Sequence, residues 1–176
     1  MAAPGAAEHP VQPLSSTPRS AGADARTAWL LVAGQFVLLA LIVLLGGGDD
    51  WSVPAWLDAA GSVAMAVGLV VMVVAAVGLG RGLTAAPLPN AHAQLRTGGL
   101  YRFVRHPIYS GLLLFVAAHT VVSGSAVQLA LAVLLTTLIM VKTRWEERRL
   151  AERFPDYIAY ASRTPRFVPF GRLWRN

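Results

Sequence analysis

The residue types best suited to chemistry stand in two short motifs, Arg105–Gly111 (RHPIYSG) and Glu146-Glu147. Together they offer a guanidinium, an imidazole, a phenol and two carboxylates, which bind charged ligands through charge-assisted hydrogen bonds. Ionisable groups gathered at the boundary of a membrane are functional candidates by default. The two motifs therefore indicate an enzyme, provided that the fold brings them together at one face of a membrane.

The chain between the motifs is suited to two passes across a bilayer. Residues 107–141 carry no charge when His119 is neutral, and Ser123-Gly124-Ser125 interrupts them with a turn. A spanning helix needs about 20 apolar residues. We therefore expect two antiparallel helices, which place Arg105, His106, Tyr109, Glu146 and Glu147 in one polar group above an apolar hairpin.

Two further uncharged runs, 28–45 and 59–80, precede the motifs, and hydrophobic residues make up 55% of the chain. The fold class that we predict is an all-α integral membrane protein with about four transmembrane helices and a C-terminal helix at the cytoplasmic interface. The expected spans are roughly 28–46, 57–79, 107–122 and 125–143. The second span carries a ridge of small residues that favours close helix packing, namely Ala60, Ala64 and Gly68.

The basic residues predict the orientation. All 15 Lys and Arg fall before residue 28, within 81–106 or from Lys142 onward, whereas the other two loops carry none. The positive-inside rule then places both termini and the 81–106 loop in the cytoplasm, in the cell (inner) membrane. Residues 1–27 are expected to be a disordered cytoplasmic tail, because they are rich in Ala, Pro, Ser and Gly. Residues 28–80 form the two N-terminal spans, and 81–176 form the region that carries the motifs.

Residues 142–161 predict a basic, partly amphipathic interface helix. Leu150, Phe154 and Tyr157 share one face, and Pro155 is expected to kink or restart the helix. The segment that follows, with Arg163 and two prolines, is expected to be irregular but docked.

Residues from about Arg81 to Pro169 resemble the isoprenylcysteine carboxyl methyltransferase and phospholipid methyltransferase group of integral membrane enzymes. The resemblance depends on matching residues in the same order: Gly99-Leu-Tyr101, RHPIYSG at 105–111, Glu146-Glu147 with Leu150, Phe154, Tyr157 to Tyr160, and Arg163-Thr-Pro165 ending at Pro169. It covers about half the chain. It implies that 81–176 is a methyltransferase core that binds S-adenosylmethionine and transfers its methyl group.

The resemblance also implies roles for single residues. Arg105, Glu147 and Arg163 would orient or activate the acceptor. The cofactor would be held by Glu147 and by the remaining motif residues: Gly99, Tyr101, His106, Pro107, Tyr109, Gly111, Glu146, Leu150, Tyr157 and Tyr160. The acceptor is expected to be a lipophilic small molecule or lipid that arrives from the bilayer, with a carboxylate, amine or thiol as its nucleophile.

Several alternatives stay open at this point. The same fold could serve an NADPH-dependent membrane reductase, and a four-span transporter or a non-catalytic assembly factor is the candidate from another class. Arg105 and the two glutamates could also form a purely structural ion pair. The absence of cysteine excludes thiolate catalysis and disulfides. We expect no metal and no nucleic acid, since the basic residues face anionic membrane lipids. The oligomeric state stays open.

Overall fold

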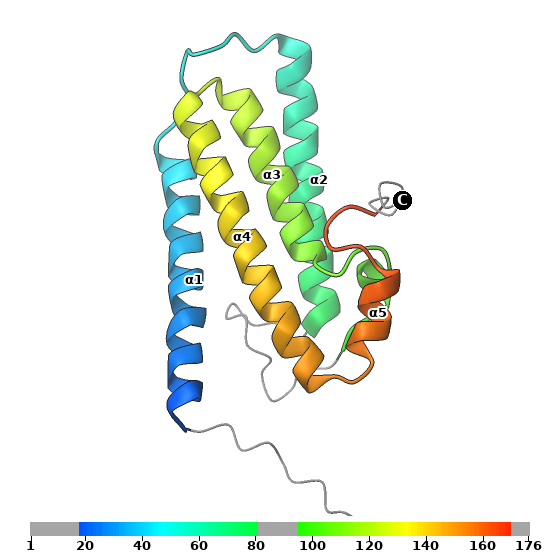
Figure 1. Ribbon diagram of the computed structural model, residues 1–176. Helices are drawn as coiled ribbons and strands as arrows, with labels where there is room; N and C mark the ends of the chain where they lie inside the picture. The colour runs from blue at the N-terminus through cyan, green and yellow to red at the C-terminus, as the bar shows by residue number, and fades with distance from the viewer. Residues whose placement is uncertain (1–17, 81–94, 170–176) are drawn as a thin grey trace, which may run out of the picture.

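The computed structural model describes residues 18–80 and 95–169, and every regular element within these ranges is a helix. Four long helices lie side by side with their axes roughly aligned (Figure 1). The α5 helix and the short 3₁₀ helix η2 lie together near one end of this bundle, which we call the α5 end. The elements are α1 (Pro18–Leu44), α2 (Ala55–Leu79), η2 (Gly99–Arg102), α3 (Pro107–Ser123), α4 (Ala126–Arg153) and α5 (Tyr157–Arg163).

Three helices are long and apolar enough to cross a membrane: Asp24–Leu44 within α1, all of α2, and α4. The fourth, α3, is apolar but has only 17 residues, or about 26 Å. Large apolar side chains cover the outside of the bundle, as a lipid environment requires. The all-α, multi-pass membrane fold predicted from the sequence is confirmed.

The α4 helix is longer than a bilayer requires. Its 28 residues extend about 42 Å, whereas a hydrocarbon core is about 30 Å thick. The last turns, which include Glu146 and Glu147, therefore extend beyond the apolar layer at the α5 end. The predicted interface helix over 142–161 is instead two elements, because α4 continues to Arg153 and α5 begins at Tyr157. The predicted break at Pro155 is confirmed.

Small residues bring α2 and α3 into close contact. The buried positions on α2 are Gly61, Gly68 and Ala75, seven residues apart, which is the spacing of a left-handed helix pair. The predicted ridge included Ala60, which is exposed. That part of the prediction is wrong because each step of four residues turns about 40° around a helix of 3.6 residues per turn, so Ala60 lies about 80° away from Gly68.

Gly68 and Gly111 lie at the closest part of this contact. A Cβ atom added to Gly111 would lie 2.5 Å from the Gly68 carbonyl oxygen and 2.8 Å from Cγ of Met72. We expect Gly111→Ala to lower the free energy of unfolding by about 1–3 kcal/mol, the usual cost of overpacking. Thermal unfolding in detergent measures the change. Gly78→Ala is the control, because its added Cβ would meet nothing within 4 Å; equal effects of the two changes would contradict the prediction.

The α1 helix packs on α4, which lies between α1 and α3 (Figure 1). Gln128, Leu135, Lys142 and Arg149 follow one another on α4 at intervals of seven residues, so they lie on one side of the helix. Three of these residues make polar contacts with α1. The Gln128 Nε2 donates to the carbonyls of Ile42 and Gly46, the Lys142 Nζ donates to Oε1 of Gln35, and Arg149 pairs with Asp24.

This contact explains two differences from the sequence-based predictions. Residues 18–27 are helical rather than disordered, since the Arg149–Asp24 ion pair of 2.5 Å and the buried Ala28 attach this segment to α4; residues 1–17 of the predicted tail lie outside the described ranges. Lys142 was counted among the cytoplasmic charges but is buried between helices.

Candidate active site

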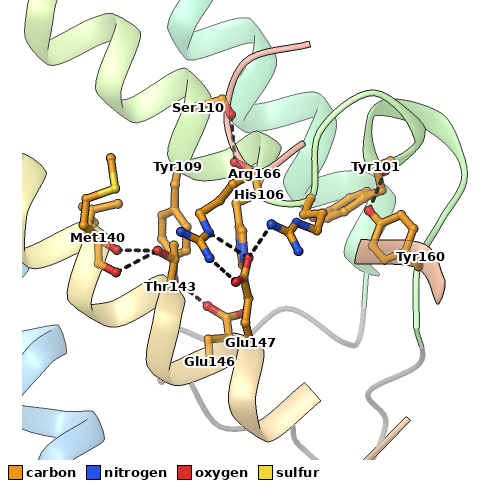
Figure 2. Close-up of polar contacts among 12 residues, drawn as sticks. Tyr101, His106, Tyr109, Ser110, Met140, Thr143, Glu146, Glu147, Tyr160 and Arg166 are labelled. Atoms are coloured by element: carbon orange, nitrogen blue, oxygen red, sulfur yellow. Dashed lines mark hydrogen bonds and ion pairs between the residues drawn. The ribbon is translucent and has the colours of Figure 1, made fainter. Parts of the chain in front are cut away.

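Glu147 is the centre of the polar group at the α5 end (Figure 2). Arg166 donates from Nε to Oε1 at 2.9 Å and from NH2 to Oε2 at 2.5 Å, which is a bidentate pair. The Nε2 of His106 lies 3.0 Å from Oε1 and must be the donor, because a carboxylate only accepts. A guanidinium nitrogen of Arg105 lies 3.4 Å from the same oxygen. Glu147 therefore joins three basic side chains from two separate segments.

Backbone pairing holds Arg166 in this position. The amides of Arg105 and His106 donate to the carbonyls of Pro165 and Arg166, at 2.9 and 3.1 Å. Ser110 Oγ adds a hydrogen bond of 2.8 Å to the Phe167 carbonyl. Residues 165–167 therefore lie across the start of α3. The predicted docking of this irregular segment is confirmed at these residues, whereas residues 170–176 lie outside the described ranges.

Glu146 occupies a different environment from Glu147. It is half-buried, and its Oε2 accepts a hydrogen bond of 3.3 Å from the Tyr109 hydroxyl. The Tyr109 ring stacks on the His106 ring, with centroids 5.6 Å apart. Among the described residues, Glu146 receives one side-chain hydrogen bond whereas Glu147 receives several. Glu146 is therefore the glutamate better suited to bind a cationic group of a ligand.

Three tyrosines lie beside this group. Tyr160 donates its hydroxyl to the Tyr101 carbonyl at 2.5 Å, and Tyr101 donates to the Ala75 carbonyl at 3.3 Å, which joins α5, η2 and α2. Burial raises the pKa of Tyr101 and of Tyr160 to about 12, and the charge of Glu146 adds to the effect on Tyr101. Burial also raises the pKa of Tyr157. These phenols are therefore neutral hydrogen-bond donors at physiological pH.

Two buried donors in this region have no hydrogen-bond partner among the described residues: Nε of Arg105 and the Tyr157 hydroxyl. Tyr157 is only 4% exposed. A buried donor without a partner costs roughly 1–3 kcal/mol. Two such unpaired donors close together are expected where a bound ligand supplies the acceptor atoms that complete their hydrogen bonds.

The structure brings most of the predicted residues together. Arg105, His106, Tyr109, Glu146 and Glu147 form one group, which with Arg166 we call the polar cap. Tyr101, Tyr157 and Tyr160 lie next to it. Gly99 has a φ of +60°, which allows η2 to start there and favours glycine. Pro107 is buried at the first turn of α3, and Leu150 is half-buried on α4.

Two predicted residues lie elsewhere. Gly111 contacts α2 rather than the polar cap, so its close approach serves helix packing. Arg163 is exposed, and its Nε donates to the Ala159 carbonyl within α5. Within this C-terminal segment, the arginine that pairs with Glu147 is Arg166, three residues later. The sequence offered one signal for it: Arg166 directly follows Pro165, in the same motif.

Comparison with known proteins agrees with the geometry. A model of the phospholipid methyltransferase family matches residues 56–157. The cobalt-zinc-cadmium resistance protein CzcN of Cupriavidus metallidurans is 36% identical over 83 residues, which cover 47% of this chain and 38% of CzcN. The protein-S-isoprenylcysteine O-methyltransferase B of Arabidopsis thaliana is 35% identical over 81 residues, covering 45% and 41% of the two chains.

A third relative is the methanethiol S-methyltransferase 1 of Bradyrhizobium diazoefficiens. It is 38% identical over 81 residues, which cover 45% of this chain and 27% of that enzyme. This chain therefore spans less than half the length of each of these three relatives. The family match includes α2, α3 and α4 and begins after α1.

Proposed function

The chain belongs to the phospholipid methyltransferase family, and from this premise we propose that it is a membrane methyltransferase that uses S-adenosylmethionine. The acceptor is a lipophilic molecule with a carboxylate, amine or thiol nucleophile. The observation that carries the proposal is the polar cap, where one half-exposed carboxylate lies near two buried donors that need acceptor atoms.

The side chains present fit the groups of this cofactor. The Glu146 carboxylate would bind its ammonium group. Nε of Arg105 and the Tyr157 hydroxyl, which lack partners among the described residues, would donate to its carboxylate or ribose oxygens. The neighbouring side chains would hold the cofactor in position beside these contacts, namely Tyr101, His106, Tyr109 and Tyr160. When bound, the cofactor supplies a methyl group on a sulfonium, which is reactive toward an in-line nucleophile.

The protein's own side chains contribute to methyl transfer by positioning the reactants and by supplying charge. In-line displacement depends on alignment, and restricting the reactants to a productive geometry is worth up to about 7–11 kcal/mol. The bidentate Arg166–Glu147 pair and the backbone bonds of residues 165–167 make the polar cap rigid. The guanidinium of Arg105 or Arg166 would attract an acceptor with an anionic head. Arg163, which the family resemblance assigns to the acceptor, is the weaker candidate for this role, because its side chain is exposed on α5 and donates to the Ala159 carbonyl.

The direct test is isothermal titration calorimetry of the purified protein in detergent. We expect S-adenosylmethionine to bind with a micromolar dissociation constant, or roughly −7 to −8 kcal/mol. NADPH serves as the comparison ligand. Binding of NADPH without S-adenosylmethionine would favour a reductase, and binding of neither would favour a transporter or an assembly factor.

The proposal also places the polar cap and both termini in the cytoplasm, where the water-soluble cofactor is found. Asp49, which lies between α1 and α2, is predicted to face the opposite side of the membrane from the cytoplasm. In intact cells, Asp49→Cys should react with an impermeant thiol reagent, whereas Thr97→Cys, just before η2, should not. The chain has no native cysteine to interfere. Labelling of Thr97→Cys alone would invert the topology and contradict a cytoplasmic cofactor site.

A further inference from the structure

The polar cap is connected to α1 through a buried lysine. The Lys142 side chain is only 2% exposed, and its Nζ donates to Oε1 of Gln35 on α1 at 2.7 Å. The same ammonium lies 5.3 Å from the centroid of the Tyr109 ring on α3. Tyr109 in turn donates to Glu146. Gln35 therefore contacts the lysine that borders the Tyr109–Glu146 pair.

Lys142 and Glu146 are one turn apart on α4, so their side chains point along the same face. A buried ammonium and a carboxylate at this spacing attract each other, and the attraction is strong where water is scarce. If the two formed a close ion pair, the carboxylate would be less available to a cationic ligand. The Gln35 amide oxygen competes for the ammonium from the opposite side, on another helix.

We propose that Gln35 is a positioning residue that holds the Lys142 ammonium toward α1 and so keeps the Glu146 carboxylate available for the ammonium group of the cofactor. The inference rests on the proposed function, because it concerns the same site. It adds a role for α1, which lies outside the residues 56–157 matched by the family.

The test is the affinity for S-adenosylmethionine in three variants, measured by calorimetry. Gln35→Leu keeps the side-chain volume but removes the acceptor, so Lys142 should turn to Glu146 and affinity should fall about tenfold. Gln35→Glu keeps an acceptor oxygen, so affinity should stay within about threefold of wild type. Adding Lys142→Met to Gln35→Leu removes the competing cation, so affinity should return to within about threefold of wild type. A structural role for Gln35 would not produce this recovery.

Gln128→Leu is the control, because Gln128 is a fully buried glutamine on α4 whose side chain also bonds to α1. It lies 18 residues from Glu146 along α4, or about 27 Å. We expect it to lower the melting temperature without changing the affinity. If it does not fold, Asp24→Asn, which removes the ion pair with Arg149, replaces it.

The outcomes separate the two proposals. Wild-type binding with an unchanged Gln35→Leu affinity would overturn the inference and leave the proposed function intact. A loss of affinity in Gln35→Leu that the double variant does not recover, or an equal loss in the control, would also overturn it. Absence of binding by the wild-type protein would overturn the proposed function and this inference with it.

Discussion

Glu147→Gln is expected to lower the free energy of unfolding by about 3 kcal/mol and to weaken S-adenosylmethionine binding at least tenfold. Glu147 is the shared anion of Arg105, His106 and Arg166, and its side chain is only 12% exposed. Removing one partner of a buried ion pair costs roughly 3–5 kcal/mol, because the remaining charges lose their compensation. A glutamine has the same shape but presents an amide donor to two guanidinium groups.

Thermal unfolding and calorimetry in the same detergent measure the two effects of this change. Glu152→Gln is the matched control on α4, because Glu152 is 69% exposed and lies 4.0 Å from Arg149. Exposed pairs of this kind contribute between about 0 and 1 kcal/mol, so we expect little change in either quantity. A Glu147→Gln protein that is less stable but binds the cofactor normally would mean that the ion pairs are purely structural.

Arg166→Ala is expected to lower turnover by about a hundredfold, which corresponds to about 2.7 kcal/mol in the activation free energy. Arg166 pairs with Glu147 and presents a cation at the polar cap, where under the proposed function it would align an anionic acceptor in the transition state. The hydrogen bond to Glu147 raises the pKa of Arg166 further above its usual value, so it stays charged at all physiological pH values. Arg166→Lys keeps the charge but loses the bidentate geometry, and we expect a smaller loss.

Arg163→Ala is the comparison that decides between the two arginines. The sequence motif gives Arg163 a role in orienting the acceptor, whereas the structure places it on the exposed face of α5. We expect Arg163→Ala to reduce turnover less than about threefold under conditions where Arg166→Ala loses a hundredfold. The reverse order would support the motif-based assignment and contradict a functional role for the Arg166–Glu147 pair. The assay is methyl transfer to an identified acceptor, with cofactor affinity measured alongside.

The sequence by itself determined the membrane class and the end of the bundle at which the polar cap lies. Long uncharged runs exclude a water-exposed fold, because a bilayer accepts only segments whose backbone is satisfied internally. The turn at Ser123-Gly124-Ser125 forces α3 and α4 to be antiparallel, so residues 105–111 and 146–147 must share one end. The residue types then defined which chemistry that end could perform. These properties follow from local composition and chain length, without knowledge of side-chain packing.

The tertiary structure decided which of these side chains pair with one another, which remain available to a ligand and which pack between helices. Backbone pairing between residues 105–106 and 165–166 selects Arg166 over Arg163 as the partner of Glu147. Two adjacent glutamates point in different directions on one helix, so Glu147 meets basic residues while Glu146 meets Tyr109. Helix contacts assign Gly111 to packing against Gly68 and bury Lys142 beside Gln35. Each outcome depends on contacts between segments distant in the sequence, which no local pattern encodes.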